Sequence, residues 1–467
     1  MSASDPFRRD LLLGLLVTVA AVALVAGLRL GDLSRRRQAA VRPNVLLVGL
    51  DTVRVDALGA YGSAGARTST IDALARRGTL FGRALAQAPV TGPSFASILT
   101  GRYPVEHTVV HSTRLLPESE LTVAERFQQR GYETAAFVSC SIVSREYGFA
   151  QGFDHFDQRF DRHYDGGHYE RGAVAVTDAA LGWLGKRSPD RPFFAWVHYF
   201  DAHAPYQPHG FGAIDPAVGT LRALRAFGSD REGRERALPS IRALYDGEVA
   251  HVDRQLGRLM GALEAAGMTE RTLVVVVADH GEELFDHDDF YGHFTQLTQS
   301  VLQVPMLMAG PEVPKGRRVG QWVETVDLLP TLLSLAGLSA QAPSGSASPV
   351  RPSGRDLTGL MQGERLPARI ARAQREPYPG MPGGLAFAAV QGRWKLQWFT
   401  QSGARLYDLS ADPLERKDLA AARLAIAVEL KKHLAPWRAA TERLGFTDPF
   451  TLPAQDRAVL EALGYIQ

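Results

Sequence analysis

The chain has very little cysteine, very little net charge and no internal repeats. Cys140 is the only cysteine among 467 residues, so no intrachain disulfide can form. That scarcity does not fix the compartment, because many exported proteins lack disulfides. The 52 basic residues nearly balance the 50 acidic ones, which leaves a net charge of +2. Nucleic-acid binding needs a clustered basic face, so we expect no nucleic-acid partner, and no obligate protein partner is evident.

Long uncharged runs are also scarce, and one at the N-terminus stands out. Residues 11–28 read LLLGLLVTVAAVALVAGL and have arginines on both sides. As a helix this run spans about 27 Å, enough for the hydrocarbon core of a bilayer. We therefore expect residues 1–42 to form a single-pass membrane anchor and a basic linker, with a cleaved signal peptide as the alternative. More arginines follow the run than precede it, which favours a cytoplasmic catalytic domain.

Beyond the anchor, strand-like runs alternate with helix-like patterns. Residues 43–51 and 272–280 are continuous apolar runs rich in β-branched side chains, as in buried parallel strands. This alternation predicts an α/β fold with a mostly parallel sheet sandwiched by helices. Further strands are expected at 134–139, 193–198 and 304–309, and helices at 69–78, 121–130, 173–184, 240–266 and 325–336.

The composition also predicts a division into domains. We expect a catalytic α/β domain at 43–338 and a loop or linker at 339–384, where residues 339–353 are small, polar and rich in proline. A C-terminal α+β subdomain at 385–467 follows. Its expected elements are strands at 385–391, 394–399 and 404–409 and a helix from about 421 to 444.

Acidic and imidazole side chains fall at or just past several predicted strand ends. Asp51 ends the first strand, Asp279 and His280 end the valine-rich strand, and His198 and His203 close or follow a third. In α/β sheets, ligands bind outside the carboxyl ends of the strands. We therefore expect one functional site at this edge of the sheet.

Thr91 stands in a Pro/Gly turn that precedes a helix-compatible segment. Pro93 suits the first turn of a helix, and a helix N-terminus favours bound anions. Thr91, Asp51, Asp279 and His280 together offer oxygens and one imidazole, a set suited to one divalent metal ion. We favour manganese, zinc or magnesium, and calcium stays open, because imidazole is a softer ligand than oxygen. The cation would lower the pKa of the Thr91 hydroxyl and make it a nucleophile.

Three histidines are candidates for substrate contact. His198, His203 and His293 can hold anionic oxygens of a substrate, and His203 and His293 are predicted to be catalytic, for example by protonating a leaving group. For each of these histidines the alternative is a structural role, in which the imidazole only hydrogen-bonds to loop backbone. We prefer this structural role for His198, and also for His287, which follows Asp279 in the chain.

Several of these segments resemble the sulfatase family of the alkaline-phosphatase superfamily. The resemblance implies an alkaline-phosphatase-like fold and a membrane-anchored bacterial enzyme whose catalytic domain is extracytoplasmic, in the periplasm. It also implies a metal-dependent hydrolase of sulfate or phosphate esters, acting on a small-molecule, glycan or lipid ester substrate. The matching segments are PNVLL at 43–47, DTVRVD at 51–56, GAYG at 59–62, TGRYP at 100–104, HYFDAH at 198–203, ADHGE at 278–282 and LYDLSADP at 406–413.

The chain departs from the family pattern at the positions that matter most. Thr91 stands where sulfatases carry the Cys or Ser that becomes formylglycine, and threonine cannot give that aldehyde. Phe95 replaces an arginine, Thr52 replaces a second aspartate, and His293 stands where a lysine is common. The set resembles threonine-nucleophile branches such as lipoteichoic-acid synthases and phosphoethanolamine transferases. A phosphodiester-type head-group transferase and a non-catalytic anion-binding member therefore stay open as alternatives to the hydrolase.

Overall fold

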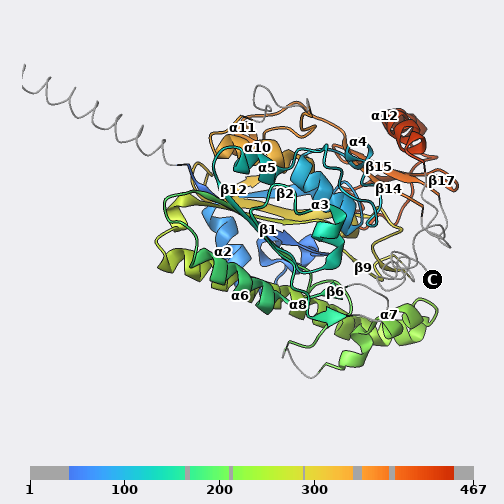
Figure 1. Ribbon diagram of the computed structural model, residues 1–467. Coiled ribbons are helices and arrows are strands. Elements are labelled where there is room, and N and C mark those ends of the chain that lie inside the picture. Colours follow the sequence, from blue (N-terminus) through green and yellow to red (C-terminus); the bar gives the residue numbers. More distant parts are fainter. Residues whose placement is uncertain are drawn as a thin grey trace, which may run out of the picture. The chain divides into compact units, whose positions relative to one another are not determined.

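The computed structural model describes residues 42–163, 169–209, 214–287, 290–339, 350–377 and 384–445 (Figure 1). The described residues from Asn44 onward belong to one compact unit. The predicted anchor at 11–28 lies outside the described residues, as does most of the proline-rich stretch at 339–353. Within the described ranges, no helix combines the length and the apolar character needed to cross a bilayer.

A sheet of nine described strands forms the centre of this unit. Strand β1, Asn44–Leu50, pairs in parallel with β7, Phe193–Tyr199, and with β8, Thr272–Ala278. Strand β11, Gln303–Ala309, is antiparallel to its two neighbours. The other pairings described for this sheet are parallel, so the sheet is mostly parallel, as predicted. The order is β12 (Arg317–Val319), β2 (Thr79–Leu85), β11, β8, β1, β7, β3 (Glu133–Phe137) and β4 (His155–Asp157), with β13 (Val323–Glu324) also on β2.

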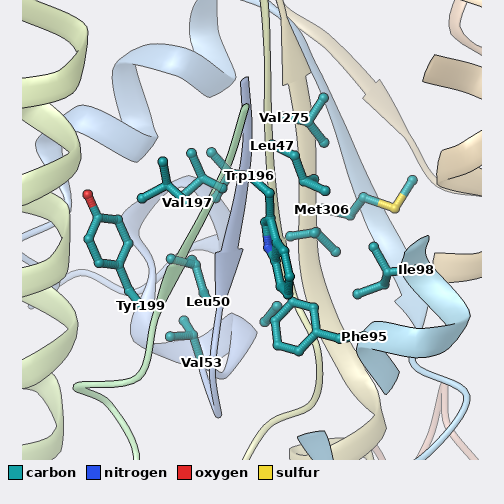
Figure 2. Close-up of a cluster of buried hydrophobic side chains, with 14 of the residues drawn as sticks. Leu47, Leu50, Val53, Phe95, Ile98, Trp196, Val197, Tyr199, Val275 and Met306 are labelled. Atoms are coloured by element: carbon teal, nitrogen blue, oxygen red, sulfur yellow. The ribbon is translucent and has the colours of Figure 1, made fainter. Parts of the chain in front are cut away.

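The middle strands are buried on both faces, which explains their unbroken apolar sequences. Every residue of β1, β7 and β8 is buried. On one face of the sheet the rings of Trp196 and Phe95 lie next to each other, with centroids 5.3 Å apart (Figure 2). The site described below is therefore built on the fully buried centre of the sheet.

Helices cover both faces of the sheet (Figure 1). The predicted helix at 240–266 is longer than expected and begins at Arg231, because the Asp230 side chain caps it by accepting a hydrogen bond from Gly233 N at 2.9 Å. Pro239 lies inside this helix, one residue before the predicted start at residue 240. One face carries α2 (Ser69–Arg77), α6 (Ala173–Leu184) and α8 (Arg231–Ala265), and the other carries α3 (Thr91–Thr100), α5 (Val123–Gln128) and α10 (Leu328–Leu335).

A second, antiparallel sheet forms the C-terminal part of the unit. The segment expected to be linker, 339–384, contains two elements that were not predicted, α11 (Thr358–Met361) and the first strand of this sheet. That strand, β14, escaped prediction because its sequence ARAQR is largely polar, although Gln374 and Arg375 are both buried. The sheet order is β14 (Ala371–Arg375), β15 (Ala386–Gln391), β16 (Trp394–Phe399) and β17 (Gly403–Asp408), followed by helix α12 (Leu424–Arg443).

Candidate active site

The carboxyl ends of neighbouring strands deliver acidic side chains to one place. Asp51 directly follows β1 and Asp279 directly follows β8. Their backbone positions are fixed by the sheet, because Asp51 N donates to Tyr199 O at 2.9 Å and Asp279 N donates to Leu50 O at 3.1 Å. Potential ligand atoms of Asp51, Asp279 and His280 all lie within 4.8 Å of one another.

Thr91 reaches this group from a different element. It is the first residue of α3, and its Oγ1 lies 3.4 Å from His280 Nε2. The side chain is buried, as are Asp51, Asp279 and His280. The structure thus brings together the four residues that the sequence analysis grouped as one cation set, with the hydroxyl at a helix N-terminus.

The hydrogen bonds of His280 decide which nitrogen is available. Its Nδ1 donates to Gly281 O at 2.9 Å, so in the neutral ring Nε2 carries the lone pair. That nitrogen lies 3.3 Å from Asp279 Oδ2. Asp279 Oδ1 is occupied by two backbone donors, Thr52 N at 3.2 Å and His280 N at 2.6 Å. His280 Nε2 and Asp279 Oδ2 therefore face the common space.

The carboxylates are short of positive charge and of hydrogen-bond donors. Both oxygens of Asp51 and Oδ2 of Asp279 are buried and have no hydrogen-bond partner within the described ranges. Burial raises the pKa of both aspartates, and for Asp51 the Asp279 carboxylate raises it further. Buried carboxylates without partners are costly unless a cation or a proton joins them. The residues present fit a divalent cation held by Asp51, Asp279, His280 and Thr91.

Two further imidazoles adjoin this group. The rings of His280 and His293 have centroids 4.3 Å apart, and His203 follows at 5.3 Å from His293. His293 Nδ1 pairs with Glu282 Oε1 at 2.8 Å, and His203 Nδ1 donates to Ala204 O at 2.7 Å. Burial raises the pKa of Glu282 to about 7 and lowers the pKa of His293 to about 3. Both rings are thus oriented through Nδ1.

A cavity of about 670 Å³ opens beside His203. Phe200, Asp201 and Glu248 also line it. Of the seven predicted site residues, His203 is the one that lines this cavity. It therefore connects the buried group to a space of ligand size.

His198 lies elsewhere, on the core side of Asp51. Its Nε2 is 3.4 Å from Asp51 Oδ2, and the Phe95 ring meets it edge-on with centroids 4.8 Å apart. The ring is fully buried, and this burial lowers the pKa of His198 to about 3. It does not line the cavity beside His203.

Arg54 is a supporting residue that the sequence analysis did not single out. Its buried guanidinium pairs with Asp56 and Asp286 and donates to Glu282 O at 2.8 Å. Tyr245 OH donates to Thr52 O and accepts from Arg54 N, both at 2.8 Å. Arg54 thereby ties the loop after β1 to the loop after β8. The only sequence signal was its position between two aspartates in DTVRVD.

Phe95 stands where the family pattern has arginine, and it belongs to the core. The ring is fully buried against Trp196 and His198. Gly49 makes room for it, since a Cβ at residue 49 would lie 2.7 Å from Phe95 Cε1. The departure at this position is therefore accommodated by the neighbouring strand.

A sequence model of the sulfatase family matches residues 43–338, which is more than half of the chain and includes every site residue named above. The chain belongs to the sulfatase family. The family assignment makes it a hydrolase of ester bonds, as the sequence analysis predicted. The resemblance drawn from the motifs is thereby confirmed, whereas the roles of the individual site residues stay predictions.

Curated relatives are similar to this family member at modest identity. An ulvan-active sulfatase from Formosa agariphila is 26% identical over 411 residues, covering 81% of this chain and 77% of the relative. A Delta 4,5-hexuronate-2-O-sulfatase from Bacteroides thetaiotaomicron is 25% identical, covering 82% and 85%. The similarity extends over most of both chains in each pair.

Solved structures share the fold. A protein solved with its substrate D-glucosamine-2-N,6-O-disulfate has a TM-score of 0.70 at 22% identity, covering 88% of this chain and all of the other. The phosphonate monoester hydrolase of Agrobacterium radiobacter has a TM-score of 0.68 at 22% identity, covering 86% and 96%. At these identities the comparison establishes the architecture, an α/β fold with a mostly parallel sheet.

Proposed function

We propose that this sulfatase-family protein is a metal-dependent hydrolase of phosphate or sulfate esters with Thr91 as its covalent nucleophile. The observation that carries the proposal is the placement of Thr91 Oγ1, at the start of α3 and 3.4 Å from His280 Nε2. Asp51, Asp279, His280 and Thr91 would hold the cation. When bound, the cation would lower the pKa of the Thr91 hydroxyl.

The reaction has two displacements. Thr91 Oγ1 forms a bond to the phosphorus or sulfur atom while the bond to the alcohol oxygen breaks, and the alcohol leaves after taking up a proton. Water then attacks the same atom, releases phosphate or sulfate and restores the Thr91 hydroxyl. We infer that His203 and His293 hold non-bridging oxygens or move the proton, and the engagement of their Nδ1 atoms with Ala204 O and Glu282 Oε1 supports this role for Nε2.

Phosphate esters suit this chemistry better than sulfate esters. Formylglycine releases sulfate by elimination from a hemiacetal, whereas a sulfated threonine must be attacked at sulfur. Phosphoryl centres accept two successive in-line displacements readily. We therefore expect phosphate mono- or diesters, or phosphonates, to be turned over faster than aryl sulfates by the same preparation.

Transfer to an alcohol is the second candidate. The cavity of about 670 Å³ beside His203 is larger than a phosphoryl group requires, so it has room for a small-molecule, glycan or lipid alcohol. In a transferase that alcohol, and not water, would accept the group from Thr91. Product analysis in water with increasing glycerol distinguishes the two, because only a transferase yields mainly the glycerol ester.

The decisive experiment joins a substrate panel to trapping of the covalent intermediate. Aryl sulfates, phosphate monoesters, phosphodiesters and phosphonates are tested with manganese, zinc, magnesium and calcium. Acid quench followed by peptide mass spectrometry should find a modified Thr91 and no aldehyde. We expect Thr91→Ala to abolish turnover and Thr91→Ser to keep part of it, since serine retains the ligating oxygen. Wild-type turnover in Thr91→Ala would refute the nucleophile and leave anion binding as the better proposal.

We also propose that residues 11–28 anchor the protein in the membrane with the catalytic domain on the periplasmic side. The uncharged run and its flanking arginines support the anchor. The resemblance to membrane-anchored bacterial members supports the periplasmic side, whereas the arginine excess after the run favours the opposite one. Membrane fractionation of the full chain, followed by protease digestion of intact cells and spheroplasts, tests both points. A catalytic domain protected in spheroplasts would place it in the cytoplasm.

A further inference from the structure

Asp51 belongs to two buried groups of potential ligand atoms, and only one of them is absorbed by the proposed function. The first contains Asp279 and His280. The second contains Cys140 and His198, whose potential ligand atoms and those of Asp51 all lie within 4.8 Å of one another. All members of the second group are almost completely buried. In this place His198 can serve as a ligand for a second cation, as a contact for substrate, or as a support for Asp51.

The hydrogen bonding of His198 distinguishes these roles. Ser139 N donates to His198 Nδ1 at 3.4 Å, so Nδ1 is the acceptor and the proton of the neutral ring sits on Nε2. That Nε2 lies 3.4 Å from Asp51 Oδ2, and neither atom has a hydrogen-bond partner in the described chain, so the Asp51 carboxylate is the acceptor within reach of this proton. His280 has the opposite arrangement, with Nδ1 donating and Nε2 carrying the lone pair. His280 is thus prepared to bind a cation, whereas His198 is prepared to donate to a carboxylate.

The packing around His198 fixes the direction of this donor. His198 of β7 is aligned with Gly49 of β1 in the parallel pairing of the two strands. Gly49 lies two residues before Asp51 in the chain. The edge-on Phe95 ring fills the space that the missing Cβ of Gly49 leaves, and the Trp196 ring lies 5.9 Å from the His198 ring. An imidazole enclosed in this way cannot turn without disturbing the core.

We propose that His198 is a positioning residue that donates from Nε2 to Asp51 Oδ2 and so leaves the other oxygen of Asp51 for the cation. This role of His198 rests on the proposed function in one respect, because it requires that Asp51 bind a cation. It assigns His198 no contact with substrate and no bond to metal. Partners that orient a ligating carboxylate raise metal affinity, and their removal typically costs about 10- to 100-fold.

Two substitutions of His198 form a matched pair. The amide nitrogen of glutamine falls near the place of Nε2, whereas that of asparagine falls near the place of Nδ1. His198→Gln therefore keeps a donor toward Asp51, and His198→Asn does not. With Mn²⁺ and the full chain, titrated calorimetrically without substrate, we expect His198→Asn to weaken binding by about 10- to 100-fold and His198→Gln to stay within about 3-fold of wild type. At saturating Mn²⁺ the KM should be unchanged in both variants.

Other results would overturn the proposal. A raised KM with unchanged Mn²⁺ affinity would make His198 a substrate contact, and a lowered Tm with neither change would make it purely structural. A second equivalent of Zn²⁺ that disappears in Cys140→Ser would make the group a metal site. A wild-type chain that binds no cation refutes both proposals, whereas one that binds Mn²⁺ and hydrolyses none of the esters refutes the proposed function alone.

A measurement on the unaltered protein covers the case in which the variants do not fold. Nitrogen-15 NMR of histidine-labelled wild-type protein separates the two neutral tautomers. Backbone N–H groups also donate to Nδ1 of the buried His107 (Val109 N, 3.1 Å) and His111 (Thr113 N, 3.4 Å), so these two rings share the tautomer and are assigned with His107→Gln and His111→Gln. We expect His198 to give a further buried, non-exchanging ring protonated at Nε2, and Mg²⁺ should not change its tautomer. If no ring protonated at Nε2 remains once the signals of His107 and His111 are assigned, the proposed donor does not exist and the proposal fails.

Discussion

At the scale of single residues, the departures from the family pattern are supported by their neighbours. Phe95 occupies a core slot that exists because residue 49 has no side chain. Thr52 has a φ of 53°, which is unfavourable for a β-branched residue, and it is held there by hydrogen bonds to Asp279 and Tyr245. The loop after β1 is thus shaped by these contacts, and the carboxylate of Asp51 depends on that shape.

The Gly49–Phe95 fit can be tested by overpacking. In Gly49→Ala the new Cβ would lie 2.7 Å from Phe95 Cε1 and 3.0 Å from Trp196 Nε1, so we expect a loss of about 1–3 kcal/mol in unfolding free energy. Combining it with Phe95→Leu should cost less than the sum of the two single changes. The control is Gly261→Ala in α8, where a Cβ meets nothing within 4 Å. Equal effects at both glycines, measured by urea denaturation, would contradict the fit.

His203 and His293 should matter to the rate, and at His293 the loss of the pairing with buried Glu282 should lower stability as well. We expect alanine at either position to lower kcat/KM by roughly 100-fold or more, because the proposed function assigns each imidazole a contact in the transition state. His433→Ala, in an exposed ion pair on α12, serves as the control. Steady-state kinetics on a phosphate ester check the prediction, and unchanged rates in both variants would reduce the two residues to structural histidines.

The sequence was informative about site residues wherever a residue adjoins a strong local pattern. Asp51 and Asp279 follow long apolar strands, and Thr91 lies in a Pro/Gly turn before a helix. Arg54 and Tyr245 were missed because their roles arise from side-chain contacts between segments far apart in the chain. No spacing rule connects residue 54 to residue 245, so only the folded structure shows the connection.

At the scale of elements, apolar strands and amphipathic helices were predictable, and polar strands were not. Strand β16 and helix α6 have the predicted bounds. Strand β2 reads TLFGRAL, in which Gly82 and Arg83 interrupt the apolar pattern at a position where the strand is less buried. Strand β14 buries polar side chains whose partners lie elsewhere. Hydrophobic periodicity predicts only where apolar side chains are buried, so it does not detect strands that bury polar side chains.

Side chains of the C-terminal sheet bind the segment that follows His293, so we expect substitutions in this sheet to affect the active site. Lys395 in β16 is fully buried, forms an ion pair with Glu415 at 2.8 Å and donates to Gln299 Oε1 at 2.9 Å. Arg375 in β14 donates to Thr295 O at 2.9 Å. Both contacts fasten the chain shortly after His293. The C-terminal sheet therefore stabilises the site without lining it.

Lys395→Met should accordingly lower both stability and turnover. Removing one partner of a buried ion pair costs about 3–5 kcal/mol, and the His293 segment loses an attachment. We expect kcat to fall while KM for a phosphate ester changes less. Lys432→Met removes an exposed lysine paired with Glu429 and should change stability by less than about 1 kcal/mol. Identical behaviour of the two variants would show that the C-terminal sheet does not position the site.

At the scale of the whole molecule, the alternation of strands and helices predicted the fold class but not the strand order. The order depends on which distant strands pair, for example β11 between β2 and β8, and no local pattern carries that information. The buried acidic site has a consequence at this same scale. Two buried carboxylates with raised pKa values lie at the carboxyl ends of the central strands β1 and β8, so the stability of the entire unit should depend on pH and on the cation.

The sign of that dependence follows from the pKa shifts. Without a cation, burial raises the pKa of Asp51 and Asp279 above their unfolded values, so the folded state binds more protons and its stability falls as pH rises through this window. A divalent cation needs the ionised carboxylates, so its affinity rises with pH. The gain in Tm on adding cation to the chelator-treated protein should therefore grow from about pH 5 to about pH 8, and a concentration of about 100 times Kd should add about 2.7 kcal/mol. In Asp279→Asn the gain should be small at every pH. A wild-type gain that is constant, or larger at acidic pH, would show that the cation does not bind at these carboxylates.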